Sequence, residues 1–283
     1  MLKNKLRRVC SIALALSACA VCATTFTACE SSKPEVEIQI EFNGKTYTLD
    51  YVLYRKIAPA TVNHFIALAE NGYYDGLCVH DYDDDRLLTG AYSYDGENLV
   101  YKKYYDVVKN YDNFPHSVWT SSDKKTSTYT LYGEFYANAD FTVESGALRQ
   151  TYGSLTMYYT KKNTEDKVTI ERHNGEGTAL REYKYNSATS QFFITLDDDQ
   201  SADDNYCTFA TLEDDDWDTL ASLQRAVLKY IENEYAGEED DFAPEVTLDI
   251  DTDDAYAANT EATATYDVPK KPIVIKKVTV TKY

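Results

Sequence analysis

The stretch VEIQIEFNGKTYTLDYVL, residues 36–53, decides the fold class of this chain. Apolar and polar residues alternate on both sides of Asn43-Gly44, and the apolar members are Val36, Ile38, Ile40, Phe42, Tyr47, Leu49, Tyr51 and Leu53. Alternation with a period of two residues is typical of a strand that buries one face. Asn-Gly between two such runs is a strong signal for a two-residue turn. The stretch therefore predicts a β-hairpin with one buried face.

The rest of the chain combines two helical segments with many short strands. The first helix begins at Pro59 and closes at Gly72, and its apolar residues at helical spacing are Val62, Phe65, Ile66 and Ala69. The second is predicted near residues 218–235, before Gly237, with the apolar stripe Leu220, Leu223, Val227 and Ile231. Further β-like runs are residues 128–132, 154–159, 191–196 and 273–281. This pattern favours a mainly β fold, a closed antiparallel barrel.

The N-terminal end has the pattern of an export signal. Residues 1–8 hold four positive charges and no acid, and a small and apolar run, residues 9–26, follows. We therefore expect a secretory signal over residues 1–28, with residues 29–35 as a polar tether. A lipoprotein signal would be cut before a cysteine: Cys29 has the tether directly after it, whereas Cys19 fits the Leu-x-small-Cys pattern better.

Lipid on Cys29 is the expectation, with Cys19 and a plain cleaved signal as the alternatives. Two acyl chains would anchor the protein stably at the outer face of a bacterial cell membrane.

The charge of the chain restricts its partners. The sequence has 28 basic and 47 acidic residues, and removal of residues 1–28 leaves 24 basic residues, a net charge of −23. Such a charge argues against nucleic acid and anionic lipid surfaces as partners, and favours neutral or basic ones. The acidic residues are expected mainly on a solvated surface.

Cysteine and acidic residues give no metal or disulfide pattern. Four of the six cysteines lie at or before position 29, and whether Cys78 and Cys207 pair stays open. Residues 249–253 alternate like a calcium loop, but Asp254 and Thr260 stand where that loop needs glycine and a bidentate glutamate. His64 is expected as a solvated residue of the first helix. No metal and no cofactor are predicted.

Three segments look like additions to a barrel plan within a single domain, residues 36–283. Residues 94–127 are rich in tyrosine and lysine, and residues 160–187 could hold an inserted hairpin around the turn residues 174–177. Residues 237–270 are acidic with little apolar periodicity. This third segment is predicted to be a surface loop.

Several motifs, in order along the chain, resemble the cyclophilin family of peptidyl-prolyl isomerases. They are Ala58–Val62 with Phe65 and Leu68, Gly72–Gly76, Gly133–Phe135, Gly153–Met157, Ser190–Ile194, Tyr206–Ala210 and Pro272–Ile275. The resemblance runs from about Val36 to Tyr283. It implies a closed eight-stranded antiparallel barrel capped by two helices, rotation of the peptide bond before proline as the activity, and proline-containing peptides or exported proteins as partners.

The resemblance also assigns site positions, and one of them is altered. The family carries a catalytic arginine directly after a histidine, and here Asp81 follows His80. Gln191 and Phe193 are retained, as a backbone-binding and a proline-stacking residue. The other substrate-binding positions fall on Leu87, Met157, Tyr206 and His80, while Thr89 stands where the family has a glutamine. An aspartate cannot donate to the proline nitrogen, so weakened catalysis is implied.

Arg86 falls on the position of a pocket phenylalanine. It could replace the missing arginine, because its guanidinium stays charged and has well-placed donors. The alternative is a surface ion pair with Asp81, Asp83, Asp84 or Asp85. For the whole protein, the alternatives to an isomerase are a catalytically silent module that binds proline peptides and a surface scaffold.

Overall fold

The computed structural model describes residues 31–135, 148–159, 167–172, 177–182, 187–197, 206–249 and 263–283. The expected signal and both candidate lipid sites lie outside these residues. Within the described part, no helix is both long and apolar enough to cross a membrane.

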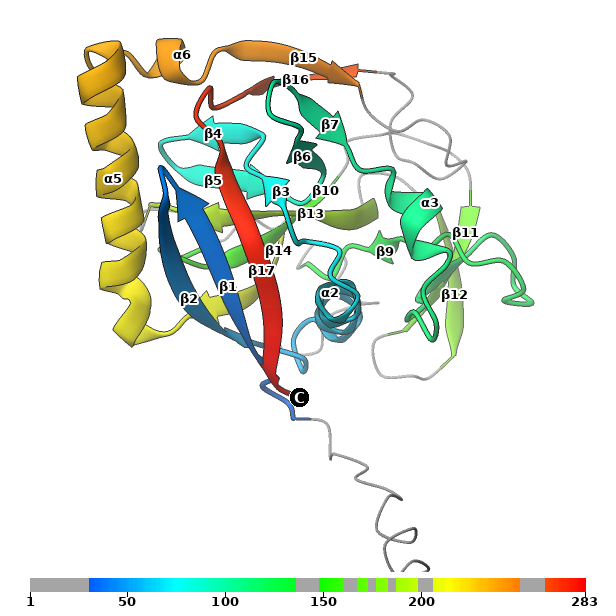
Figure 1. The fold of residues 1–283 in the computed structure, drawn as a ribbon. Helices are drawn as coiled ribbons and strands as arrows, with labels where there is room; N and C mark the ends of the chain where they lie inside the picture. The colour runs from blue at the N-terminus through cyan, green and yellow to red at the C-terminus, as the bar shows by residue number, and fades with distance from the viewer. Residues whose placement is uncertain are drawn as a thin grey trace, which may run out of the picture. The chain divides into compact units, whose positions relative to one another are not determined.

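One large sheet forms the body of the protein (Figure 1). In spatial order its main path is β4 (Asp81–Asp83), β5 (Arg86–Thr89), β13 (Ser187–Thr195), β10 (Leu155–Tyr159), β14 (Cys207–Leu212), β2 (Lys45–Leu53), β1 (Glu35–Phe42), β17 (Ile273–Lys282), β3 (Leu77–Cys78), β6 (Tyr92–Tyr94) and β7 (Leu99–Tyr101). A further strand, β9 (Leu131–Tyr132), pairs with β13 off this path. The pairings among these described strands are antiparallel.

The sheet is an open, curled half-barrel of these strands, so the expectation of a closed eight-stranded barrel is wrong. The physical reason lies in two interrupted chain segments. One segment forms β3 and then β4, and the other forms β5 and then β6, with Gly90 at φ +99° in the second gap. β4 and β5 pair with each other, and β5 continues to β13, whereas β3 and β6 lie on the β17 side. The ladder therefore has two ends.

The hairpin predicted around Asn43-Gly44 is confirmed. β1 and β2 pair from Phe42↔Lys45 outward, and Asn43 and Gly44 take φ values of 48° and 78°. Positive φ at both central residues is the geometry that a type I′ turn requires. The alternating apolar residues of β1 and β2 are buried, as the pattern predicts.

Both predicted helices are confirmed. α2 spans Pro59–Glu70 and α5 spans Trp217–Tyr235, and the predicted stripe of α5 is buried. Both contribute to the same hydrophobic core, and α5 lies along β1 and β2 (gold in Figure 1). The left-handed residue that ends α5 is Ala236, at φ 55°, directly before the expected Gly237. The described residues also include the shorter helices α3 (Tyr104–Val108), η2 (Asp214–Asp216) and α6 (Glu239–Phe242).

His64 corrects the expectation of a solvated helix residue. It is 1% exposed, and its Nε2 lies 3.0 Å from the Tyr104 hydroxyl. Burial lowers the pKa of His64 to about 3, so the ring is neutral at pH 7. The tyrosine-rich segment after β7 supplies this cover, and helical spacing alone could not reveal it.

The segments expected as additions build two small sheets. β11 (Lys167–Glu171) and β12 (Thr178–Glu182) form the hairpin expected within residues 160–187, which is confirmed. β8 (Val118–Trp119) pairs with β11, so the additions at 94–127 and 160–187 form one three-stranded sheet.

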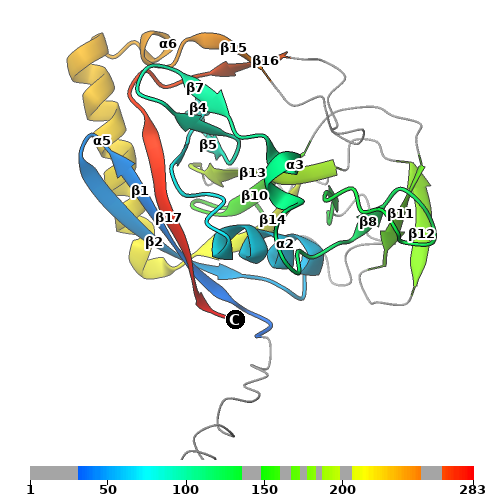
Figure 2. The same ribbon diagram turned by 45° about the vertical axis from the view of Figure 1, so that its right-hand side comes forward.

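The third addition is not the predicted surface loop. It forms α6 and a hairpin of β15 (Glu245–Asp249) and β16 (Thr263–Asp267), while residues 250–262 lie outside the described part. Among its acidic residues there is a short alternation of apolar and polar residues. The apolar side chains of Leu248, Ala264 and Tyr266 face the body of the protein. Figures 1 and 2 both show this hairpin beside β4, against which β16 packs.

Candidate functional site

Strand β13 separates the main core from a second, smaller cluster of aromatic residues. Its side chains alternate: Phe192 and Ile194 lie in the main core, while Phe193 lies in the smaller cluster. We call this group the Phe193 cluster, and its buried members are Leu88, Ala91, Tyr92, Phe193 and Tyr266. Leu88 of β5 pairs with Phe193, and the Tyr206 ring meets the Phe193 ring edge-on at 5.5 Å.

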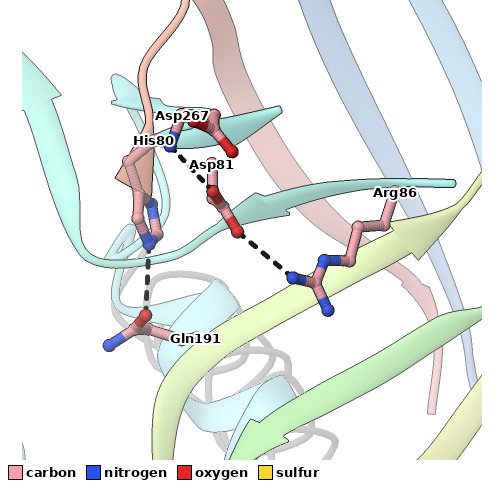
Figure 3. Close-up of polar contacts among 5 residues, drawn as sticks. All are labelled: His80, Asp81, Arg86, Gln191 and Asp267. Carbon is pink, nitrogen blue, oxygen red and sulfur yellow. Dashed lines mark hydrogen bonds and ion pairs between the residues drawn. The ribbon is translucent and has the colours of Figure 1, made fainter. Parts of the chain in front are cut away.

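His80 and Gln191 form one polar contact at this cluster (Figure 3). Nε2 of His80 and Oε1 of Gln191 are 3.1 Å apart. The amide oxygen is an acceptor, so the neutral ring donates through Nε2. Burial lowers the pKa of His80 to about 4, against the opposite effect of the Gln191 hydrogen bond, so the ring is neutral at pH 7. The rings of Tyr92 and Tyr266 lie 4.8 Å and 5.0 Å from it.

Asp81, at the position of the family arginine, makes two contacts (Figure 3). Its Oδ2 lies 3.4 Å from Nη2 of Arg86, and its Oδ1 accepts the backbone N–H of Asp267 at 3.0 Å. The Asp81 side chain is 13% exposed. The carboxylate therefore joins β4 to both its neighbour β5 and the end of β16.

Arg86 faces the Phe193 cluster as well as Asp81. The centre of its guanidinium lies 5.9 Å from the centroid of the Phe193 ring, within cation–π distance. Its Nε is buried and has no hydrogen-bond partner among the described residues. The structure thus combines the two expectations for Arg86, a pair with Asp81 and a cation beside the retained phenylalanine.

Two expected substrate-binding residues are not at this site. Leu87 and Met157 are each 2% exposed and belong to the main core. The reason is the period of a strand: Arg86 faces the Phe193 cluster, so Leu87 must point the other way, and Met157 pairs with the core residue Phe192. Leu87 lines a cavity of about 470 Å³ next to α5. Thr89 is buried too, and donates to the Cys78 carbonyl at 2.9 Å.

The remaining expected residues are brought together, with two that sequence reasoning missed. His80, Gln191, Phe193, Tyr206 and Arg86 all lie at or beside the Phe193 cluster. Tyr266 and Asp267 were missed, because they belong to the acidic addition. The only available signal was the apolar alternation before Asp267, which the surrounding acids obscured.

The two cysteines of the described residues do not form a disulfide. Cys78 and Cys207 are both buried and free, so the open question of a bridge between them is answered. Burial raises the pKa of the Cys78 thiol to about 11. Over the residues that the structure covers, no group of three His, Cys, Asp or Glu side chains is arranged to hold a metal ion.

Comparison with known proteins identifies the family. The family model for "cyclophilin type peptidyl-prolyl cis-trans isomerase/CLD" matches residues 37–241. Curated proteins of Staphylococcus aureus and Staphylococcus haemolyticus, provisionally named peptidyl-prolyl cis-trans isomerases, are 35% identical over 55 residues, which is 19% of this chain and 28% of theirs.

Solved structures of a Cryptosporidium parvum cyclophilin type isomerase are also similar. One of them covers 89% of this chain and 99% of its own, with 16% identity and a TM-score of 0.44; another was determined in the presence of the dipeptide Ala-Pro. The family match covers most of the chain, from β1 to α6. The protein belongs to the cyclophilin-type peptidyl-prolyl cis-trans isomerase family.

Proposed function

We propose that the protein is an exported peptidyl-prolyl cis-trans isomerase, or foldase, whose turnover is weakened by Asp81. Its substrates are prolyl bonds in proline-containing peptides and exported proteins. The observation that carries the proposal is the position of the Arg86 guanidinium over the ring of Phe193, on the strand that also carries Gln191. A ring, an amide and a cation at one site match the needs of a twisted prolyl bond.

The chemistry requires a donor rather than a cofactor. Amide resonance gives the peptide bond a rotational barrier of roughly 18–20 kcal/mol, and uncatalysed prolyl isomerisation takes tens to hundreds of seconds or so. In the half-rotated state the proline nitrogen accepts hydrogen bonds, which it does not do when planar. A donor that meets this nitrogen therefore stabilises mainly the transition state.

Arg86 can donate a hydrogen bond to the proline nitrogen, whereas the Asp81 carboxylate cannot. A carboxylate such as that of Asp81 can only accept hydrogen bonds, and its charge repels a substrate carbonyl oxygen. Arg86 has donors beyond the Nη2 that faces Asp81, including the buried Nε without a partner among the described residues. The nearby carboxylate offsets part of the guanidinium charge, so the proposal is a slow enzyme rather than an efficient one.

Replacing Arg86 by alanine tests the proposal. We expect kcat/KM for a blocked Ala-Pro peptide to fall by roughly ten- to a hundredfold, at or below the usual loss for one transition-state donor. The Arg86→Lys variant keeps the charge but loses the planar fork, and it should lie between the two. Isomerisation is measured by exchange NMR at micromolar protein. Unchanged turnover in the Arg86→Ala protein would exclude Arg86 as the replacement donor.

A catalytically silent, peptide-binding module is the second candidate. It is favoured by the contacts of Asp81, since one carboxylate oxygen faces Arg86 and the other holds the Asp267 N–H. Peptide binding without isomerisation in the parent protein would select this candidate.

We further propose that the protein is held at the outer face of the cell membrane by lipid on Cys29, or on Cys19. The basic N-terminus, the apolar run after it and the polar tether support this proposal. A client reached there is a chain that has just been exported. The large negative charge of the mature chain favours neutral or basic clients over nucleic acid.

The Cys29→Ser variant should lose the lipid and move from the membrane to the soluble fraction. The physical reason is that the lipid would be attached through the Cys29 thiol, and two acyl chains are what stable anchoring requires. Labelling of cells with a fatty-acid analogue and fractionation measure the result. The Cys19→Ser variant is the matched control and should stay lipidated at the membrane. Loss of the lipid in Cys19→Ser but not in Cys29→Ser would show that Cys19 carries it.

A further inference from the structure

We infer that the β15–β16 hairpin covers the Phe193 cluster and competes with a prolyl peptide for it, with Asp81 as its anchor. This inference rests on the proposed function, because it concerns the same site. It gives the substituted residue a positive role: the carboxylate that replaces the family arginine holds a segment of the chain itself over the site.

The hairpin has two unlike faces. Tyr266 of the hairpin is itself a buried member of the Phe193 cluster, and Leu248, Ala264 and Val268, just beyond β16, pack against that cluster. Thr247 and Thr265 are exposed on the other face, with their hydroxyl oxygens 3.5 Å apart. An apolar face turned to the protein and a polar face turned to water show that the hairpin is docked and not merely adjacent.

Three contacts fix the end of β16 at the site. The Tyr266 ring meets the His80 ring edge-on at 5.0 Å and the Tyr92 ring at 6.1 Å. The next residue, Asp267, donates its backbone N–H to Asp81 at 3.0 Å. A hydrogen bond to a charged acceptor is stronger than one between neutral groups, so Asp81 is a firm anchor.

The base of the hairpin is held separately from its docked face. The Val268 N–H donates to the Pro244 carbonyl at 3.1 Å, and the Lys270 N–H to the Phe242 carbonyl at 2.9 Å. Phe242 is fully buried and meets the Tyr82 ring at 5.4 Å. The docked strands can therefore be removed, or can move away, without loss of the attachment at Phe242.

The Phe193 ring has almost no free surface on which a peptide could stack. A proline ring can stack on an aromatic ring only if one face of that ring is free. Phe193 is 4% exposed and Tyr266 8%, although both lie on the outer side of β13. The Tyr206 ring and the Arg86 guanidinium meet Phe193 directly, and the hairpin closes the same cluster through Tyr266. A peptide that enters the cluster has to displace the hairpin, so its apparent affinity is reduced to the fraction of molecules that are open.

Excision of residues 245–267, with Gly-Gly joining Pro244 to Val268, tests the inference. The two ends are already within hydrogen-bond distance, so a short link spans them. We expect a blocked Ala-Ala-Pro-Phe peptide to bind the excised protein at least tenfold more tightly than the parent, as measured by NMR titration. Tyr266→Ala should give a smaller gain in the same direction, and Thr265→Ala, on the exposed face, should give none.

A second measurement does not depend on the peptide. His80 is neutral and buried under Tyr266, and its pKa of about 4 should rise toward the ordinary value of 6.5 when the hairpin is removed. Titration of the His80 ring protons by NMR measures this pKa in the full-length chain, in the excised protein and in the Tyr266→Ala variant.

The outcomes separate the inference from the proposed function. Equal peptide affinity in the parent and excised proteins overturns the inference and leaves the isomerase proposal in place. Tighter binding without isomerisation supports the inference and removes the isomerase proposal. If neither protein binds peptide, a raised His80 pKa in the excised protein supports the cover, and an unchanged value overturns it.

Discussion

Replacing Gly90 by alanine should lower the free energy of unfolding by about 3 kcal/mol, the sum of a backbone and a packing cost. Gly90 has φ +99°, where a side chain is strained. A Cβ there would lie 2.3 Å from the Ser190 carbonyl oxygen and 2.9 Å from the Gln191 Cα. These are backbone atoms of β13, so no flexible side chain can move aside. Urea denaturation of the two proteins measures the loss.

Gly96 provides the matched control. Its φ of +108° is close to that of Gly90, but a Cβ there would meet nothing within 4 Å. Gly96→Ala should therefore show the backbone cost alone, about 1 kcal/mol. If the two variants lose the same free energy of unfolding, the β13 backbone does not crowd a side chain at position 90.

Gly90 also matters for the site. It lies in the gap between β5 and β6, and its carbonyl accepts the Ser190 hydroxyl at 2.7 Å. The strand that it touches carries Gln191 and Phe193. The close approach therefore sets the position of the two retained family residues, and any relief of the clash would shift them relative to His80 and Arg86.

Features set by neighbouring residues could be predicted from the sequence. The hairpin at Asn43-Gly44 needs positive φ at two positions, and asparagine and glycine are the residues that adopt positive φ most readily. The stripe of α5 recurs every three or four residues, and burial of Leu220 and Ile231 follows from it. The strand with Gln191 and Phe193 was likewise found from its own pattern and from its family resemblance.

Faces and long-range contacts could not be predicted in the same way. The family resemblance assigns both Arg86 and Leu87 to the site, but neighbours on a strand point to opposite sides. Asp267, one of the two partners of Asp81, is 186 residues away in the sequence, in a segment whose acidic residues indicate a loop. Closure of the barrel depends on where β3–β4 and β5–β6 break, which no local signal reveals.

Glu134 shows a further long-range contact with an effect on stability. α2 begins with Pro59, which has no N–H, and its N-cap residue Ala58 provides no side-chain cap. Glu134, which lies outside the helix, provides the cap. Its two carboxyl oxygens accept hydrogen bonds from the backbone N–H groups of Ala60 at 3.0 Å and Thr61 at 2.7 Å. The residue is 3% exposed, so these groups have little access to water in its place.

Burial gives this contact a dependence on pH. It raises the pKa of Glu134 to about 7 from the ordinary 4.5, against the lowering effect of the Thr61 and Ala60 hydrogen bonds. A group whose pKa is raised by folding stabilises the protein below its unfolded pKa, and this stabilisation is lost as pH rises through the folded value. Between pH 5 and pH 8 the loss is about 2.5 kcal/mol for a shift of this size.

The Glu134→Gln variant should therefore lack this slope. Its free energy of unfolding, minus that of the parent, should rise by about 2.5 kcal/mol from pH 5 to pH 8, because only the parent loses a proton at this position. Other acids that titrate in both proteins, Glu239 among them, cancel in the difference. Glu171→Gln, which removes a carboxylate 44% exposed and paired with Lys124, should keep the parent's slope. A Glu134→Gln slope equal to that of the parent would show that Glu134 stays ionised, held by the two N–H groups at the start of α2.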